Sequence, residues 1–257
     1  MTSLAEALAA LEPVAQGWRG TVPDNWLQGR TAYGGFSAAL ALHAAKQAVA
    51  DLPPLRSALV AFVGPLAGDV TVEARLLRRG RNAAFVQADV CGEAGLGLRA
   101  TFVFMRARDS AIDHVTGTAP AFPRPEPGDT TCRGTRGVAF TGNFEFLDCR
   151  DDRLGPAEWL RWLRLAAREG LDPEVEMMAV ADCLPPAALR LVGGVAPVSS
   201  MTWQLNLLSP PVTQDGWFLL RTDSRFTRAG LSSQSMAIWS ADGTPLAEQM
   251  QSVAIFA

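Results

Sequence analysis

The carboxyl group with the most unusual surroundings in this sequence belongs to Asp182, which lies in the middle of the apolar stretch "MMAVADCLPPAAL". Burial raises the pKa of a carboxyl group unless hydrogen bonds favour its ionised form. A positioned carboxylate can take a proton from an attacking water, and general base catalysis of this kind accelerates a reaction by about 10²–10⁴. Asp182 is therefore a candidate base, and the alternative is a simple turn former before the two prolines.

The last strand-like stretch, "PLAEQMQSVAIFA", places two glutamines on an unexpected face. At the two-residue period of a strand, Gln249 and Gln251 point the same way as Val253 and Ile255. A buried amide without a partner costs roughly 1–3 kcal/mol, so an inward-facing glutamine needs hydrogen bonds. An amide or a hydroxyl can donate to a carboxylate while it also engages water. Both glutamines are therefore candidates for a hydrated polar site.

Further candidates lie near the start of an Ala-rich segment, in "TAYGGFSAALALHAA". Gly34 and Gly35 would let a ligand approach the backbone, and the free N–H groups of a helix N-terminus polarise a carbonyl or hold an anion. Tight helix packing explains two glycines equally well. Tyr33 either lines the same cavity or acts as a hydrophobic staple. Arg228 is a candidate for binding ligand phosphates, because a guanidinium group suits phosphate oxygens.

Composition and residue counts exclude several classes of function. With a net charge of −3 and no long basic run, nothing in the 257 residues favours nucleic acid or an anionic membrane as the partner. His43 and His114 are the only histidines, which argues against zinc and against most histidine-based triads. The cysteines include no CxxC pair, which argues against a disulfide framework; they are Cys91, Cys132, Cys149 and Cys183. No stretch approaches the roughly 20 apolar residues that span a bilayer, so we expect a cytoplasmic protein.

The elements that must position these groups occur in the same order twice. In the first half, a possible short helix at 2–11 precedes a longer helix at 36–50, which is rich in Ala and Leu and is ended by Pro53. Four strand-like runs follow, each bounded by Gly, Pro or Asn. They are "LRSALVAFVGPL", "GDVTVEARLLRRG", "NAAFVQADVCG" and "GLGLRATFVFMRA".

Residues 107–137 have the composition of a linker, with "APAFPRPEPGDTTCRGTRG" at their centre. This predicts an N-terminal domain at 1–106 and a C-terminal domain at 138–257. The second half starts with the strand-like "VAFTGNFEFLDCR", followed by two predicted helices in "PAEWLRWLRLAAREG" and "PEVEMMAVADCLPPAALR". Four more strand-like runs complete it: "APVSSMTWQLNLLSP", "GWFLLRTDSRFTRAG", "LSSQSMAIWSADG" and "TPLAEQMQSVAIFA".

The repeated order indicates an internal duplication. A constant shift along the chain aligns Gly95 with Gly243, and the same shift places Val103 opposite Gln251. The first copy therefore lacks the amide. We predict one polar site per chain, in which the second half supplies the polar side chains and the first half supplies a helix end and a pocket wall.

One long helix wrapped by a bent antiparallel sheet, present twice, is an α+β double hotdog arrangement. Three stretches, "AYGGFSAALALHAA", "AVADCLPPAAL" and "SADGTPLAEQMQSVAIF", resemble the type II (TesB-like) acyl-CoA thioesterases, and the element order matches over nearly the whole chain. In that family an Asp, a Thr or Ser, and a Gln of the second hotdog hold the water that attacks the thioester. Matched position by position, the resemblance assigns these roles to Asp182, Ser200 and Gln251.

The resemblance implies an enzyme that hydrolyses an acyl-CoA to a carboxylic acid and CoA, without a metal or other cofactor, and that forms a homo-oligomer. Asp182 would be the base, and backbone N–H groups near Gly35 would polarise the thioester carbonyl. Ser199 and Thr202 are alternatives to Ser200 for the hydroxyl, as Gln249 is to Gln251.

One departure from the family leaves a second function open. Where typical bacterial members have an Asp-His pair after the hydroxyl, this chain has Thr202-Trp203. A protein that binds an acyl group or an acyl-CoA without hydrolysing it is therefore the alternative. An enoyl-CoA hydratase is less favoured, because such enzymes on this fold usually rely on an Asp and a His, and His43 is the only plausible histidine.

Overall fold

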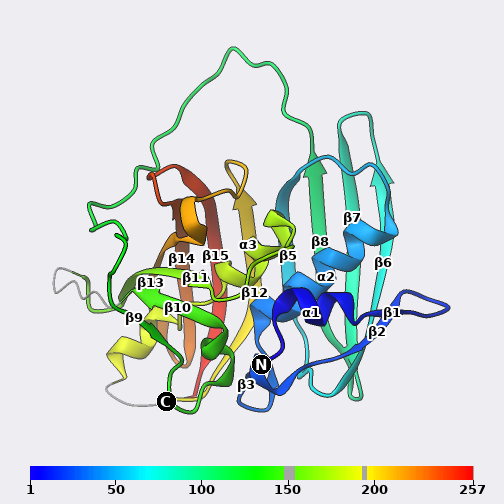
Figure 1. The fold of residues 1–257 in the computed structure, drawn as a ribbon, viewed down its shortest axis with the longest axis horizontal. Coiled ribbons are helices and arrows are strands. Elements are labelled where there is room, and N and C mark those ends of the chain that lie inside the picture. Colours follow the sequence, from blue (N-terminus) through cyan, green and yellow to red (C-terminus); the bar gives the residue numbers. More distant parts are fainter. Residues whose placement is uncertain (148–153, 193–195, 257) are drawn as a thin grey trace.

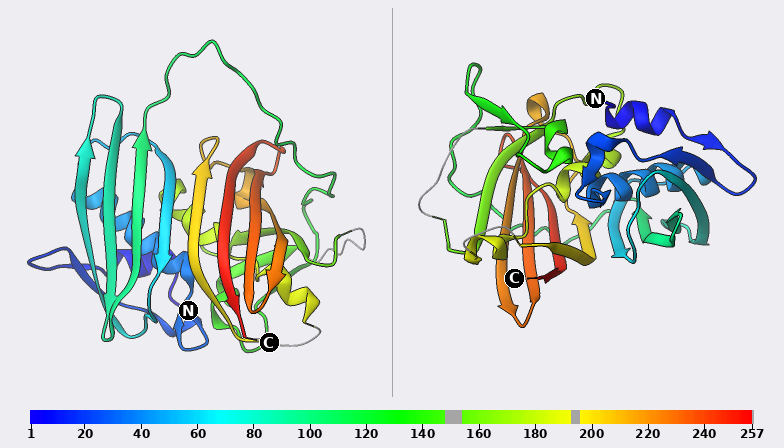
Figure 2. Two further views of the ribbon diagram at one scale, coloured as in Figure 1. Left: turned by 180° about the vertical axis from the view of Figure 1, so that it is seen from behind. Right: turned by 90° about the horizontal axis from the view of Figure 1, so that it is seen from below.

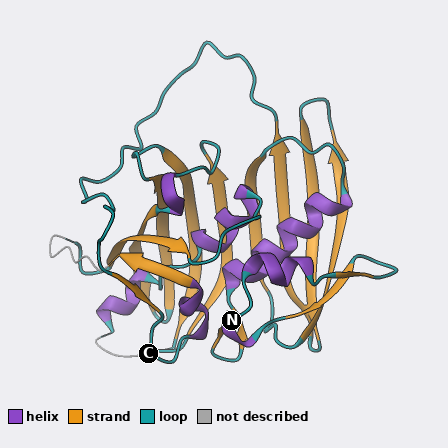
Figure 3. Cartoon of the chain, in the orientation of Figure 1, coloured by secondary structure: helices purple, strands orange, loops and turns teal. Residues whose placement is uncertain are grey.

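The structure, a computed structural model, describes residues 1–147, 154–192 and 196–256. Within these residues, one antiparallel sheet of 13 strands runs through the molecule in the order β1-β2-β6-β7-β8-β5-β12-β15-β14-β13-β11-β10-β9. The long helices lie on one face of this sheet (Figures 1 and 3), and the view from behind shows the strands in front of them (Figure 2, left). Each half of the chain curves its strands around one main helix, so the fold is the predicted α+β double hotdog.

The main helix of the first half is α2 (Gly34–Ala48), which is buried along most of its length. Its many alanines favour the helix and let the strands pack closely against it. The predicted short helix is also present, and the four predicted strands form as expected. These elements are α1 (Leu4–Ala9), β5 (Leu55–Phe62), β6 (Asp69–Arg79), β7 (Ala83–Gly92) and β8 (Gly95–Met105). Shorter elements precede or flank α2: β1 (Glu12–Pro13), β2 (Trp18–Thr21), η1 (Asp24–Trp26), β3 (Leu27–Gln28) and β4 (Thr31–Ala32).

The main helix of the second half, α3 (Pro173–Ala181), begins with a strong N-terminal signal. Asp172 accepts hydrogen bonds from the backbone N–H groups of Glu174 and Val175, and Pro173 occupies the first helical position. The four long strands of this half are β12 (Val198–Leu207), β13 (Phe218–Arg228), β14 (Leu231–Ser240) and β15 (Pro245–Ile255). The edge strands and 3-10 helices are β9 (Thr131–Arg133), η2 (Ala139–Asn143), β10 (Phe144–Leu147), β11 (Glu158–Leu165), η3 (Ala187–Leu191) and η4 (Gln214–Gly216).

The two halves are joined both through the sheet and through the helices. β5 pairs with β12, with Val60 opposite Trp203, so the strands of both halves form one continuous sheet. On the helical side α2 packs against α3, and the Tyr33 hydroxyl donates a 2.7 Å hydrogen bond to the Ala179 carbonyl. Lys46 of α2 binds two carboxylates at the start of α3. The two halves are therefore held together on both the sheet side and the helix side.

The helix predicted for "PAEWLRWLRLAAREG" is wrong, because Glu158–Leu165 forms the strand β11 between β10 and β13. Leu163 and Leu165 face the main core, whereas Leu160 and Trp162 face a second apolar cluster on the other side of the sheet. Since both faces are buried, apolar residues occur at both parities and the two-residue period of a strand is obscured.

That second cluster forms because the segment after β8 crosses the outer face of the second half. Residues 106–130 contain no helix or strand, and Figure 1 shows them arching from the first half to the second. Phe122 packs on this outer face, and the carbonyls of Pro123 and Gly117 accept hydrogen bonds from the indoles of Trp162 and Trp239. Among the described residues, no helix is long and apolar enough to cross a bilayer.

Two other predicted elements are shorter than expected. The strand-like "VAFTGNFEFLDCR" forms η2 and then β10, and its last three residues, Asp148, Cys149 and Arg150, lie outside the described residues. The second predicted helix ends at Ala181 instead of continuing to Arg190. Pro185 and Pro186 lack the N–H groups that a continuing helix needs, so the chain leaves α3 at Asp182.

The internal duplication needs one correction of register. Gly95 and Gly243 are equivalent, with φ angles of +94° and +91° in the β7–β8 and β14–β15 turns. The second turn is one residue longer, because Val90 pairs with Leu98 whereas Ile238 pairs with Ala247. The residue equivalent to Gln251 is therefore Phe102 and not Val103. Phe102 is fully buried, so the first half still has an apolar side chain where the second has an amide.

The two turn glycines should be equally hard to replace. We expect Gly95→Ala and Gly243→Ala each to lower the free energy of unfolding by about 1 kcal/mol, because an alanine is strained at a positive φ angle. Gly80→Ala is the matched control, since its φ angle is ordinary and a Cβ there would lie 3.6 Å from the Ala83 carbonyl oxygen. Denaturant unfolding measures all three. Equal effects at Gly80 and Gly95 would contradict the turn geometry.

Candidate active site

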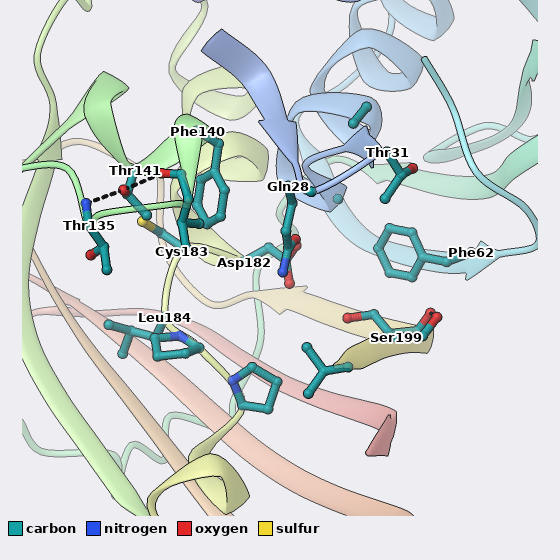
Figure 4. A pocket seen from close by; sticks show the side chains of 18 of the residues that line it. Gln28, Thr31, Phe62, Thr135, Phe140, Thr141, Asp182, Cys183, Leu184 and Ser199 are labelled. Atoms are coloured by element: carbon teal, nitrogen blue, oxygen red, sulfur yellow. Dashed lines mark hydrogen bonds between the residues drawn. The ribbon is translucent and has the colours of Figure 1, made fainter. Parts of the chain in front are cut away.

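A cavity of about 860 Å³ lies between the two halves and exposes Asp182 in its wall. Figure 4 shows the Asp182 side chain between two differently lined ends. The end built by the first half mixes polar residues and glycines with apolar side chains; among them are Gln28, Thr31, Gly34, Phe62, Val63, Pro65, Leu66 and Gly97. The end built by the second half has more of the bulky apolar residues, namely Val138, Phe140, Phe146, Leu147, Leu184 and Leu189, beside polar ones such as Thr135 and Thr141. We call these ends the first-half arm and the second-half arm.

Three of the predicted site residues meet at Asp182. The Nε2 amide of Gln251 donates to Asp182 Oδ1 over 2.8 Å and to Ser200 Oγ over 3.1 Å. Gln251 comes from β15, Ser200 from β12 and Asp182 from the end of α3, and all three line the cavity. One amide group therefore holds the carboxylate and the hydroxyl together.

The first half contributes the start of α2 to the same site. The backbone N–H of Gly35 favours the ionised form of the Asp182 carboxyl group and so lowers its pKa. Gly34 lines the cavity, and a Cβ at this position would lie only 2.6 Å from Asp182 Oδ2 and 2.9 Å from the Phe62 ring. Gly34 is thus required for the close approach of the Asp182 carboxylate to the start of α2. A role for the backbone N–H groups near Gly35 in polarising a substrate carbonyl stays a prediction.

Burial raises the pKa of Asp182 to about 7, although the hydrogen bonds from Gln251 and Gly35 act in the opposite direction. The neighbouring titratable groups are Tyr33 and Cys183, and burial raises the pKa of each well above its ordinary value. Both are therefore neutral near pH 7 and place no full charge beside the carboxylate. Asp182 exchanges its proton close to neutrality, as a general base requires.

The structure separates the alternatives for the hydroxyl and the amide. A β-bulge between Ser200 and Thr202 shifts the register of β12, so Thr202 points to the outer face of the sheet. Ser199 lines the cavity but is exposed, and its hydroxyl lies 3.5 Å from the Ser200 carbonyl. Gln249 is buried on the same face of β15, two residues before Gln251, and its Oε1 accepts a 2.7 Å hydrogen bond from the Trp203 indole.

Three of the four predicted substrate-binding residues, Gly35, Tyr33 and Arg228, do not line the cavity. Tyr33 is buried, stacks on Phe140 with ring centroids 4.1 Å apart, and uses its hydroxyl to tie α2 to α3. Arg228 ends β13 opposite Leu231, at the hairpin with β14. A role for Arg228 in binding phosphates therefore stays a prediction. Cys91, Cys132 and Cys183 are free thiols, and Cys149 lies outside the described residues.

The sequence reasoning missed Gln234, whose side chain touches Gln251. Gln234 lies on β14 directly opposite Gln251 and is 1% exposed. The run "LSSQSMAIWS" alternates Ser232, Gln234 and Met236 on one parity, and a buried glutamine in such a row was the available signal.

Family models identify the class of protein. Residues 22–105 match the acyl-CoA thioesterase N-terminal domain, and residues 115–255 match the acyl-CoA thioesterase C-terminal domain. These matches cover most of the chain, so the protein belongs to the acyl-CoA thioesterase family. A search of curated protein sequences finds no match.

Solved structures with the same fold span the whole chain. A hotdog-fold protein of unknown function from Alicyclobacillus acidocaldarius is 21% identical, with a TM-score of 0.88 over 100% of this chain and 99% of that one. The tesB protein of Mycobacterium avium subs paratuberculosis is 19% identical, with a TM-score of 0.79 over 99% and 100%. An acyl-CoA thioesterase II from Mycobacterium marinum is 18% identical, with a TM-score of 0.75 over 98% of each chain. These similarities support the double hotdog fold.

Replacing Asp182 with Asn should make the stability of the protein less dependent on pH. Because the pKa of Asp182 is about 7 in the folded protein instead of 3.8, the folded state keeps a proton that the unfolded state releases. The wild-type protein therefore loses stability as the pH rises from about 4 to about 7, by an amount on the order of 4 kcal/mol. The Asn variant lacks this loss. Denaturant unfolding between about pH 5 and pH 8 measures the difference.

Asp89→Asn is the control for this experiment. A hydrogen bond from Arg99 lowers the pKa of Asp89, so its contribution to stability is lost only as the pH falls through that lowered value. The difference between wild type and Asp89→Asn should stay constant from about pH 5 upward. A similarly constant difference for Asp182→Asn would show that the Asp182 carboxyl group titrates normally.

Proposed function

We propose that this member of the acyl-CoA thioesterase family hydrolyses an acyl-CoA to a carboxylic acid and free CoA. The observation that carries the proposal is the hydrogen-bonded group of Asp182, Gln251 and Ser200 in the wall of a cavity large enough for an acyl chain. Hydrolysis of a thioester needs a positioned water, a base and donors for the oxyanion. The chain offers a candidate for each.

In the proposed mechanism, a water donates one hydrogen bond to the free oxygen of Asp182 and another to Ser200 Oγ. The ionised Asp182 takes a proton from this water as its oxygen attacks the thioester carbonyl carbon. The tetrahedral intermediate then collapses, the carbon–sulfur bond breaks, and the proton on Asp182 passes to the CoA sulfur. Gln251 keeps the carboxylate and the hydroxyl in place, because its Nε2 donates to both.

The start of α2 is the proposed site of carbonyl polarisation. A helix N-terminus carries partial positive charge, and Gly34 at this end lines the cavity. Since the Gly35 N–H binds Asp182, we assign the donor role to the Gly34 N–H. This assignment narrows the role that the resemblance implies for the backbone N–H groups near Gly35.

The two arms of the cavity suit the two parts of the substrate. The second-half arm has more of the bulky apolar residues, so it favours the acyl chain. The first-half arm has small residues and polar groups such as Gln28 and Thr31, which suit the amides of the pantetheine chain.

Two other functions on this fold find less support. No histidine is among the described residues that line the cavity, and burial lowers the pKa of His43, so the Asp and His pair of a hydratase has no counterpart at Asp182. A protein that binds acyl-CoA without hydrolysis is the remaining alternative, since Thr202-Trp203 replaces the family's Asp-His pair. Stoichiometric acyl-CoA binding without CoA release would favour this alternative.

Release of CoA from a panel of acyl-CoAs tests the proposed function. We expect the wild-type protein to turn over at least one of them, and Asp182→Asn to lower kcat by about 10²–10⁴. Because the mechanism needs ionised Asp182, kcat/KM should rise with pH and level off above about 7. Full activity in Asp182→Asn would contradict the mechanism.

Filling the second-half arm should shorten the preferred acyl chain. We expect Leu184→Trp to reduce kcat/KM for dodecanoyl-CoA by about 10-fold or more relative to acetyl-CoA, because the ring occupies space that a long chain needs. Gln28→Trp, in the first-half arm, is the control and should affect both substrates alike. A change in chain-length preference with Gln28→Trp alone would reverse the assignment of the arms.

A further inference from the structure

Gln234 lies beside the proposed active site without touching Asp182. Its Nε2 donates a 2.5 Å hydrogen bond to Gln251 Oε1, and its Oε1 accepts a 3.2 Å hydrogen bond from the backbone N–H of Ala187. Gln251 then turns its Nε2 toward Asp182 and Ser200. Two amides thus connect a backbone donor to the carboxylate.

The backbone N–H of Ala187, where this series of hydrogen bonds begins, fixes the orientation of both amides. An N–H group only donates, so the atom of Gln234 that faces Ala187 must be the oxygen. The nitrogen of Gln234 therefore faces Gln251 and requires the oxygen of Gln251 in return. This leaves the nitrogen of Gln251 as the atom that faces Asp182. Only this orientation gives every donor and acceptor in the series a partner.

The first half of the molecule supports a specific role for the pair of amides. Gln234 and Gln251 lie directly opposite each other on β14 and β15, and the equivalent pair on β7 and β8 is Val86 and Phe102. Both of these are fully buried. The same place in the duplicated fold is therefore stable with apolar side chains, and packing alone does not call for two buried amides.

We propose that Gln234 is a positioning residue, which fixes the orientation of the Gln251 amide so that its nitrogen donates to the Asp182 carboxylate. The inference rests on the proposed function, because Asp182 is the base of that reaction. In the opposite orientation, Gln251 would present an oxygen to the carboxylate, and the ionised form of Asp182 would lose a donor and gain a repulsive neighbour.

Ala187 links this series of hydrogen bonds to the wall of the cavity. It begins η3, directly after Pro185 and Pro186, and both prolines and Leu189 line the second-half arm. Gln234 thus holds this wall and the Gln251 amide in one hydrogen-bonded arrangement.

The titratable groups beside Asp182 are neutral near pH 7, so the Gln251 amide strongly affects the ionisation of Asp182. Among the described residues, the titratable groups that interact with Asp182 are Tyr33, on α2, and Cys183, the next residue along the chain. Burial raises the pKa of both, so they are neutral near pH 7. The donors to the carboxylate are the Gln251 amide and the Gly35 backbone N–H.

Gln234→Met tests the inference, because methionine has a similar volume and no amide donor. Relative to wild type, we expect kcat to fall about 10-fold or more with little change in KM. The midpoint of the kcat/KM pH profile should also move up by about one unit, since Asp182 becomes harder to ionise. A residue with a purely structural role would lower thermal stability without moving this midpoint.

Two further variants make the test specific. In a Gln251→Met background, Gln234→Met should have no further effect on the midpoint, because Gln234 acts through Gln251. Gln249→Met is the matched control, as this buried amide on the same face of β15 binds Trp203 instead. Additive shifts in the double variant, or an equal shift in Gln249→Met, would overturn the inference.

Carbon NMR titration of the Asp182 carboxyl group separates this inference from the proposed function. It reports the pKa of Asp182 in the wild type and in Gln234→Met without any turnover. Failure to hydrolyse any acyl-CoA would refute the proposed function, whereas an unchanged Asp182 pKa in Gln234→Met would refute the role of Gln234.

Discussion

The arrangement around the cavity depends on the burial of one carboxyl group. Taking Asp182 out of water raises its pKa to about 7, and the donors from Gln251 and Gly35 keep that value from rising further. Without these donors the group would stay protonated near pH 7, and without burial it would be a weak base. The balance explains why Gly34 has no side chain and why an amide faces inward from the last strand.

The duplicated fold builds this site from unlike halves. The second half supplies Asp182, Gln251 and Ser200, whereas the first supplies the start of α2, with Gly34 and Gly35. At the positions of the two amides, the first half has apolar residues that only pack. Pairing of β5 with β12 and packing of α2 against α3 hold the unlike parts together. The cavity around the polar group is therefore lined by both halves.

Sequence patterns predict much of the fold, and the incorrect predictions have local causes. Apolar and polar residues alternate in several of the strands β5 to β8, which are bounded by turn residues. The helix α2 is rich in helix-forming residues. The strand β11 was mistaken for a helix because both of its faces are buried. Val103 was mistaken for the counterpart of Gln251 because one extra residue in the β14–β15 turn shifts the pairing, which element order alone does not reveal.

The chemically unusual side chains can be recognised from the amino-acid sequence alone: an aspartate in an apolar stretch and glutamines among inward-facing residues. Such residues stand out because each carries a desolvation cost that only a specific partner offsets. Which partners these side chains have depends on how distant segments pack together. The bulge that turns Thr202 outward, the Gly35 N–H that binds Asp182, and the Gln234 amide that orients Gln251 arise where distant segments meet. The direction of each hydrogen bond depends on contacts between segments that are distant in the sequence, and local sequence does not encode it.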